Sequence, residues 1–352
     1  MPPDRLIGWD LGGAHLKLAQ VDLEGQLLGV SQLPCPIWKG LECLDRALEE
    51  ASRLISADRP IHAVALTAEL ADIFEDRRQG VQVLIEHFSA HLKTGEIRVF
   101  AGRAGLLPVA EIASHMMDIA SANWLASGRF AAQACHRGIL IDIGSTTTDL
   151  VEFRDRQVCY RGYSDGERLR SGELLYTGVV RTPVMAVVRQ APFEGEWQTL
   201  MAEHFATLAD VYQLTGQLGA LAPPIVFDTA DGAGRGPLEC ARRLARMLGR
   251  DLESAALAQW QGLAHYIRRA HLDLIRAAVE RILSRGVETQ YLPLVGAGIG
   301  RFLVGELAAQ LGHQFIDFSD LVAANPALRS LAAVCAPATA LAYLARSSLN
   351  SR

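Results

Sequence analysis

The chain has 352 residues, half of them hydrophobic, with a formal net charge of −5 and a pI near 6.1. This length is sufficient for two domains with complete cores, and the hydrophobic content excludes a chain that is disordered as a whole. No run of like charges stands out, which argues against nucleic acid as the main partner.

Targeting and membrane signals are weak. No basic leader precedes an apolar core at the N-terminus, so we expect no export signal and a cytoplasmic protein. The apolar stretch 331–345 contains Pro337 and is shorter than the roughly 20 residues of a membrane span, so we expect a packed helix and no membrane partner. The six cysteines form no CxxC pair, as is typical of reduced, buried thiols. The oligomeric state stays open.

Hydrophobic periodicity predicts three strands at the start of the chain, followed by helices and strands in alternation. The expected strands are 6–11, 15–23, 26–33, 61–67 and 97–100, and the expected helices are 41–56, 80–92 and 109–125.

The second half begins in the same way and then carries larger insertions. We expect strands at 139–143, 147–153 and 157–162, a helical region through 201–214, a brief strand at 224–228, helices at 238–248 and 252–284, and a strand, glycine-rich turn and helix over 291–312.

The segment ILIDIGSTTTDLVEF, residues 139–153, carries the strongest motif. Asp142 ends an apolar strand, a turn rich in glycine and hydroxyl groups follows, and Asp149 leads into a second apolar strand. Such a turn directs backbone N–H groups and hydroxyls toward one point and can hold a phosphate. Asp142 is then placed to hold a hydrated Mg²⁺ or to act as a base. The alternative is an ordinary hairpin whose polar residues only cap the backbone.

The same pattern occurs near the N-terminus, in IGWDLGGAHLKLAQVD, residues 7–22. When Asp10 is aligned with Asp142, Gly12 falls on Gly144 and Lys17 on Asp149. Two strand–Asp–Gly–turn–strand units indicate two related halves that face each other across one site.

This pair of turns resembles the phosphate loops of the superfamily that contains sugar kinases, heat-shock chaperone ATPases and actin. The resemblance implies an α/β fold with two ribonuclease-H-like domains facing a central cleft. We expect one domain over 1–136, completed by a C-terminal helix at 331–352, and a second over 137–330. The resemblance also implies a third loop along the chain, the glycine-rich turn with Gly296, Gly298 and Gly300, which would contact a nucleoside if one binds.

Within the superfamily, the motif from Asp142 to Asp149 resembles the hydantoinase/oxoprolinase group. A closer likeness, over nearly the whole chain, is to a branch associated with methanofuran-type cofactor synthesis. It is carried by motifs at 67–72, 120–124, 172–178, 181–183 and 228–232. That resemblance implies a transferase that joins an aminomethylfuranylmethyl diphosphate to the phenol oxygen of a γ-glutamyl-tyramine, or of a tyrosine derivative, and releases diphosphate.

The resemblance and the residue types together give a set of candidate site residues. Asp10 and Asp142 are the expected Mg²⁺ or metal-water ligands, and Lys17 offers a point charge to the same anion. Asp149, Glu69 and Glu173 are candidates for the group that takes the phenol proton. The phosphate contacts are expected from Gly12, Gly13, Gly144, Ser145, Thr146 and Thr147, and the substrate contacts from Glu69, Asn123, Trp124 and Arg181.

Two alternatives stay open beside the transferase. One is an ATP-dependent enzyme, either a small-molecule kinase or a hydrolase of the hydantoinase/oxoprolinase type, and the other is a non-catalytic nucleotide-binding scaffold. Ala14-His15 stands where many kinase-type relatives carry a small hydroxyl residue, so ATP is possible but not favoured as a cofactor.

Overall fold

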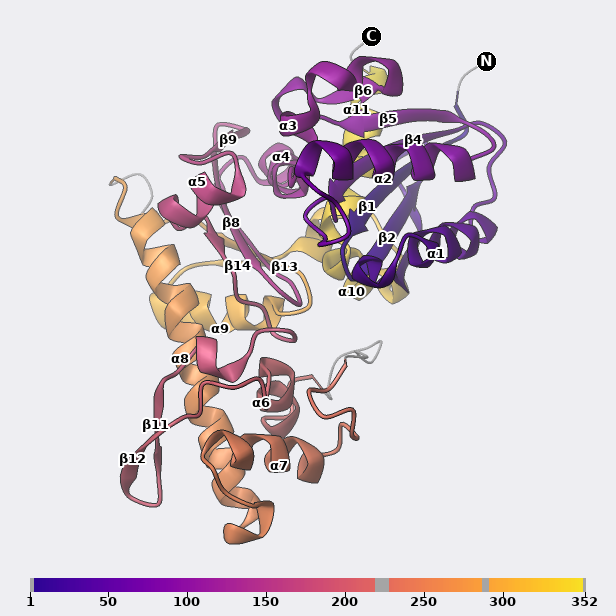
Figure 1. Cartoon of the computed structure of the whole chain (residues 1–352). Coiled ribbons are helices and arrows are strands. Elements are labelled where there is room, and N and C mark those ends of the chain that lie inside the picture. The colour runs from indigo at the N-terminus through magenta and orange to yellow at the C-terminus, as the bar shows by residue number, and fades with distance from the viewer. Residues whose placement is uncertain (1–2, 219–227, 287–290, 351–352) are drawn as a thin grey trace.

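The computed structural model describes residues 3–218, 228–286 and 291–350, and these form a mixed α/β protein built on two sheets (Figure 1). The first sheet has the order β3-β2-β1-β4-β5-β6 and the second has the order β10-β8-β7-β13-β14, with β9 paired to β8. In each sheet the central strand, β1 or β7, pairs antiparallel with the next strand in sequence and parallel with a later one. The two halves therefore repeat one topology, as the duplicated motif predicts.

The first sheet consists of β1 (Arg5–Gly12), β2 (His15–Val21), β3 (Leu27–Pro34), β4 (Pro60–Thr67), β5 (Glu96–Phe100) and β6 (Leu106–Pro108). The second consists of β7 (Gly138–Ile143), β8 (Thr148–Arg154), β9 (Gln157–Cys159), β10 (Leu174–Leu175), β13 (Leu294–Ala297) and β14 (Phe315–Asp317).

The helices are α1 (Glu42–Arg53), α2 (Arg77–His91), α3 (Met116–Ile119), α4 (Asn123–Cys135), α5 (Asp165–Ser171), α6 (Leu208–Leu214), α7 (Pro237–Met247), α8 (Leu257–Leu283), α9 (Arg301–Leu311), α10 (Pro326–Val334) and α11 (Ala336–Asn350). The strands β11 (Gln190–Phe193) and β12 (Glu196–Thr199) form a separate hairpin.

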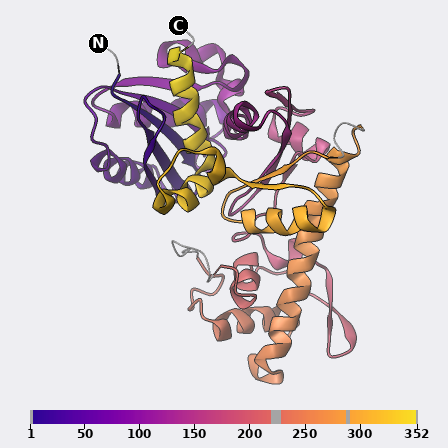
Figure 2. The same cartoon turned by 180° about the vertical axis from the view of Figure 1, so that it is seen from behind.

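Three groups of buried side chains hold these layers together. One packs α1 and α2 on the first sheet, a second fills the space around α4 and α11, and the third packs α6 to α9 on the second sheet. Figure 2 shows α11 in yellow lying along the first sheet, although it is the last helix of the chain. A Cβ atom on Gly8 would lie 1.9 Å from the carbonyl oxygen of Ala338, so this close contact between β1 and α11 requires glycine.

Two expected helices are wrong in their extent. The expected helix 109–125 is a 3-10 segment, Val109–Ser114, followed by α3 and then by α4, which starts only at Asn123. Ser121 breaks it with a φ of 52°. The expected C-terminal helix at 331–352 begins earlier, at Pro326, and is divided at Cys335 into α10 and α11, which are bent by 104°.

Other expectations have mixed outcomes. The expected helical region through 201–214 is helical only from Leu208, and the hairpin β11–β12 lies before it. The brief strand expected at 224–228 falls almost entirely outside the described residues. The predicted domain limits stay a prediction.

Within the described ranges, no single helix combines the length and apolar composition needed to cross a membrane, and only the bent pair α10 and α11 meets both conditions together. All six cysteines are free thiols.

Candidate functional site

The two predicted phosphate turns occupy equivalent places in the two sheets. Asp10 of β1 pairs in register with Lys17 of β2, and Asp142 of β7 pairs with Asp149 of β8. Gly12 and Gly13 form the first turn, and in the second the N–H of Gly144 donates to the carbonyl oxygen of Thr147 at 2.9 Å. The repeat in the sequence is therefore a repeat in structure. The strand after the first turn carries a basic side chain, Lys17, where the strand after the second carries an acidic one, Asp149.

Asp10 is a buried carboxylate with two partners. Its Oδ2 lies 3.3 Å from Nζ of Lys17, and its Oδ1 accepts a hydrogen bond from Nδ2 of Asn123 at 3.3 Å. Burial favours the neutral form of Lys17, but the charges of Asp10 and Asp142 outweigh this effect and raise the Lys17 pKa. Lys17 is therefore a positive charge that pairs with Asp10 and is also stabilised by Asp142.

Asp142 differs from Asp10 because no hydrogen bond or ion pair among the described residues engages its carboxylate. Burial raises the pKa of Asp142 to about 7, the charge of Lys17 opposes this rise, and Asp149 and Asp10 add to it. A cation bound beside Asp142 would relieve the repulsion among these carboxylates. No group of three potential metal ligands occurs among the described residues. Two carboxylates suit a Mg²⁺ that keeps most of its waters, so Asp142 and Asp10 are the residues that would hold it.

Asp149 forms an ion pair that fixes it in place. Its Oδ1 lies 2.6 Å from Nη1 of Arg168, a buried side chain of α5 whose Nη2 also donates to the carbonyl oxygen of Glu173. The guanidinium carbon of Arg168 lies 4.0 Å from the ring centre of Trp124. Burial raises the pKa of Asp149, and Arg168 opposes that rise. Trp124 is only 4% exposed, so it supports Arg168 and has little surface left for a substrate.

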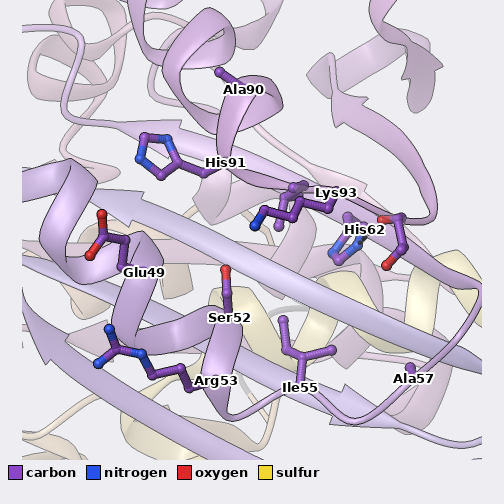
Figure 3. A pocket seen from close by; sticks show the side chains of 11 residues that line it. Glu49, Ser52, Arg53, Ile55, Ala57, His62, Ala90, His91 and Lys93 are labelled. Carbon is purple, nitrogen blue, oxygen red and sulfur yellow. Dashed lines mark hydrogen bonds between the residues drawn. The ribbon is translucent and has the colours of Figure 1, made fainter.

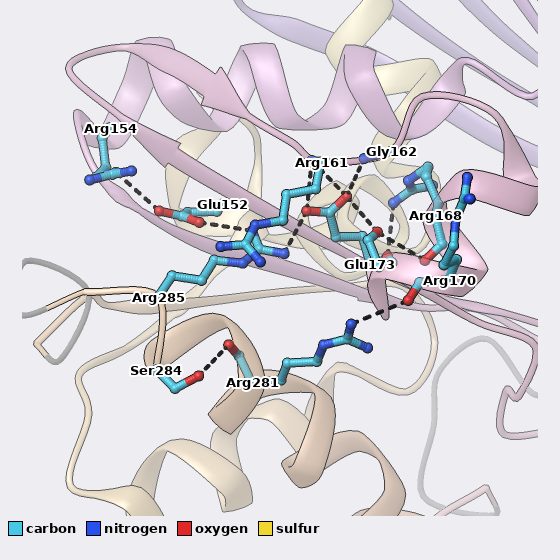
Figure 4. Close-up of polar contacts among 11 residues, drawn as sticks. Glu152, Arg154, Arg161, Gly162, Arg168, Arg170, Glu173, Arg281, Ser284 and Arg285 are labelled. Carbon is cyan, nitrogen blue, oxygen red and sulfur yellow. Dashed lines mark hydrogen bonds and ion pairs between the residues drawn. The ribbon is translucent and has the colours of Figure 1, made fainter.

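Glu173 is a structural carboxylate. It accepts from the backbone N–H groups of Arg161 and Gly162 and from Arg285 (Figure 4). It also accepts from the Ser171 hydroxyl. Burial would raise its pKa, but these hydrogen bonds outweigh burial and lower it. A carboxylate with this many donors is a poor proton acceptor, so Glu173 is not suited to act as the base.

Residues 178–181 pack against the second turn. The N–H groups of Val179 and Arg181 donate to the carbonyl oxygens of Gly144 and Ser145, at 3.1 and 2.8 Å. A Cβ atom on Gly178 would lie 2.5 Å from the Gly144 oxygen. This contact leaves the hydroxyls of Ser145 and Thr146 partly exposed and 3.4 Å apart.

The third glycine-rich turn closes the site on the side of Asp142. Gly298 has a φ of +79°, and a Cβ atom there would lie 2.3 Å from the carbonyl oxygen of Ile143 and 2.4 Å from Oδ1 of Asp142. Gly300 donates to the same carbonyl at 2.9 Å, and Gly296 packs against Phe315. Packing alone therefore requires these glycines, and their contact with a nucleoside stays a prediction.

Glu69 belongs to a second polar cluster, beyond the end of β4. The Ser121 hydroxyl lies 2.7 Å from Oε1 of Glu69 and 3.1 Å from Oδ2 of Asp165, and Asp165 also pairs with Arg77 at 2.8 Å. One hydroxyl hydrogen cannot serve two carboxylates, but a protonated Glu69 can donate to Ser121 while Ser121 donates to Asp165. Burial raises the pKa of Glu69, consistent with this neutral form.

Trp38 is a site residue that the sequence did not identify. It lies in a 3-10 segment, Ile37–Lys39, and the guanidinium carbon of Arg181 lies 4.7 Å from its ring centre. An aromatic residue after the third strand gives no local signal of function, because its position beside Arg181 depends on how the two halves pack.

Two surface hollows lie away from this site. One, of about 530 Å³, is lined by Arg53, His62, His91 and Lys93 among others (Figure 3). His62 is near the start of β4, whereas Thr67 at its other end pairs with Gly12 of the first turn. The other, of about 540 Å³, lies between polar side chains of α8 and α9. Neither contains the paired aspartates.

The two sheets and the paired turns form the actin-like ATPase fold that the sequence predicts. A family model described as hydantoinase/oxoprolinase matches residues 61–342, and the chain belongs to that family. Among solved structures, a nucleotide-free acetone carboxylase is similar with a TM-score of 0.54 and 11% identity, over 97% of this chain and 70% of that one. A ROK family glucokinase from Streptomyces griseus aligns with a TM-score of 0.49, 15% identity and coverage of 97% and 99%.

Two curated relatives share one name, (4-{4-[2-(gamma-L-glutamylamino)ethyl]phenoxymethyl}furan-2-yl)methanamine synthase. The protein from Methanocaldococcus jannaschii is 30% identical over 281 residues, which cover 80% of this chain and 82% of the relative. The protein from Methanococcus vannielii is 24% identical over 215 residues, which cover 61% and 93%. The chain is thus similar to two proteins that carry this synthase name.

Proposed function

We propose that this protein is a transferase that condenses an aminomethylfuranylmethyl diphosphate with the phenol of a γ-glutamyl-tyramine or tyrosine acceptor. The observation that carries this proposal is the similarity to the synthase from Methanocaldococcus jannaschii over most of both chains. The product in that name is an ether between a phenol oxygen and a furanylmethyl carbon. Making such an ether requires a leaving group on the methylene carbon and a phenol as the nucleophile.

The proposed reaction exchanges one carbon–oxygen bond for another. The bond between the methylene carbon and the diphosphate oxygen breaks, and the bond between that carbon and the phenol oxygen forms. The diphosphate leaves with the electron pair, and the phenol loses a proton. An electron-rich ring stabilises positive charge on the methylene carbon, so the enzyme mainly needs to stabilise the departing anion.

The residues around the two turns are suited to that task. Lys17 holds a positive charge 3.3 Å from Asp10, and the charge of Asp142 also acts on it. Ser145 and Thr146 of the second turn are partly exposed. Asp142 and Asp10 would hold a hydrated Mg²⁺, which would supply further positive charge to neutralise the diphosphate. The anion would therefore be bound by the turns and the cations together.

The ion pairs and hydrogen bonds of the three candidate carboxylates indicate which group accepts the phenol proton. Asp149 is paired with Arg168, and Glu173 is fully hydrogen-bonded. The cluster at Ser121 favours a neutral Glu69. None of these is a free base, and the departing diphosphate, which becomes basic as its bond to carbon breaks, is the acceptor that we propose.

The second candidate is an ATP-dependent small-molecule kinase or a hydrolase of the hydantoinase/oxoprolinase type, which the family match also fits. The two candidates differ in their need for nucleotide. The purified protein with Mg²⁺, donor and acceptor should form the ether and release diphosphate without ATP, as mass spectrometry and a pyrophosphate assay would show.

A matched pair of lysine variants tests the site itself. Lys17→Met should reduce turnover at least a hundredfold, an order-of-magnitude expectation for loss of one preorganised charge. Lys93→Met, which removes an exposed lysine at the remote hollow, should leave it unchanged. Equal activity of both variants would remove Lys17 from the mechanism.

A further inference from the structure

Trp38 is attached to the first phosphate turn by the backbone around it. The N–H of Ile37 donates to the carbonyl oxygen of Gly13 at 3.1 Å, and the N–H of Cys35 donates to that of Ala14 at 2.9 Å. Although it follows a buried residue, Trp38 is 39% exposed. The indole is therefore a flat, partly exposed surface fixed beside the turn that we propose for diphosphate.

The side chain that covers this indole comes from the other half of the protein. Arg181 donates its backbone N–H to the carbonyl oxygen of Ser145 in the second turn, and its guanidinium lies 4.7 Å from the Trp38 ring centre. His15 lies close to both cations: burial, with Lys17 and Arg181, lowers its pKa to about 4. His15 is thus neutral at neutral pH, and Lys17 and Arg181 carry the positive charge here.

The chemistry of an arylmethyl diphosphate places its ring close to its phosphates, because a single methylene joins them. A donor bound at the turns must therefore rest its furan ring on a group next to them. Trp124 is not such a group, since it is buried beneath Arg168. An indole face attracts flat rings and cations, and the proposed donor carries both a furan and an aminomethyl group, which is an ammonium at neutral pH.

We propose that Trp38 is the residue that binds the furan ring of the donor and so selects an arylmethyl diphosphate over diphosphate alone. In this structure the guanidinium of Arg181 lies over the indole, so the furan ring takes its place there when the donor binds. This assignment rests on the proposed function, because it names the residue that recognises the donor of that reaction.

The test compares two ligands in calorimetry with Mg²⁺ and without acceptor: the aminomethylfuranylmethyl diphosphate and inorganic pyrophosphate. Trp38→Ala should weaken donor binding about tenfold, the order expected for loss of a ring–ring and cation–ring contact, and Trp38→Phe should retain most of it. Pyrophosphate binding should stay within about twofold of wild type in both variants, which also shows that they fold.

Trp197→Ala provides the matched control. Trp197 is 65% exposed on β12 and lies against Tyr266, far along the chain from either turn, so this variant should bind both ligands as wild type does. Unchanged donor binding in Trp38→Ala, or an equal loss for both ligands, would overturn the assignment. If the wild-type protein bound pyrophosphate but did not bind the donor, the proposed function itself would fail, and the assignment with it.

Discussion

Replacement of Glu69 by glutamine tests whether a carboxylic acid is held neutral beside the site. Glutamine has the shape of the protonated acid and can still donate to Ser121, which lies 2.7 Å from Glu69 in the structure. If Glu69 is neutral, the substitution should cost little stability near neutral pH. It should also remove a pH dependence that the wild-type protein has.

The sign and size of that dependence follow from the raised pKa. Burial raises the pKa of Glu69 above its ordinary value of 4.5. Protonated Glu69 therefore contributes fully to the free energy of unfolding below about pH 4.5, and this contribution is lost as the pH rises through the pKa of Glu69 in the folded protein. Across that window the free energy of unfolding of the wild-type protein should fall relative to Glu69→Gln by up to about 1.4 kcal/mol per pH unit.

Urea unfolding of both proteins between about pH 5 and pH 7.5 measures this difference. Glu173→Gln is the matched control, because the pKa of Glu173 is lowered and its carboxylate accepts several hydrogen bonds. That variant should lose on the order of 1–3 kcal/mol at neutral pH, with a deficit that shrinks only as the solution becomes acidic. If Glu69→Gln behaved like Glu173→Gln, Glu69 would be ionised, and the proposed hydrogen bond from protonated Glu69 to Ser121 would be wrong.

Two further predictions concern the paired turns. Asp10→Ala and Asp142→Ala should each remove most turnover and weaken Mg²⁺ binding while thermal unfolding stays cooperative, and near-wild-type turnover in either variant would exclude that aspartate from the site. Gly298→Ala should lower both stability and activity, because the new Cβ would lie 2.4 Å from Oδ1 of Asp142. Gly312→Ala is the control, since Gly312 has a similar φ of +71° but no atom within 4 Å of the new Cβ. It should lose only roughly 1 kcal/mol of stability in thermal unfolding, from backbone strain. Equal effects of the two alanines would show that contact with Asp142 is unimportant.

The strands and the two turns were predictable because their signals are local. The Asp-Gly pattern after each apolar strand specifies a turn wherever it occurs. Each end of the expected β1, β4 and β7 lies within one residue of the observed end. The helix expected at 109–125 was wrong because Ser121 takes a left-handed conformation while its hydroxyl contacts Glu69 and Asp165, which are distant in sequence.

The partners of the site residues were not predictable for the same reason. The guanidinium of Arg168 pairs with Asp149 and stacks on Trp124, and both partners lie far from it in the sequence. Trp38 approaches Arg181 only because the two halves pack together. Composition identifies a tryptophan or an arginine, but the contact that gives it a role is set by tertiary structure.

The most direct test of the central claim is the stoichiometry of the reaction with ATP enzymatically removed. The purified protein, Mg²⁺, the aminomethylfuranylmethyl diphosphate and the phenolic acceptor should yield ether and diphosphate in equal amounts, with Lys17→Met as the inactive reference. Ether that forms only after ATP is restored, with ADP produced in step, would contradict the account and identify an ATP-dependent enzyme in its place.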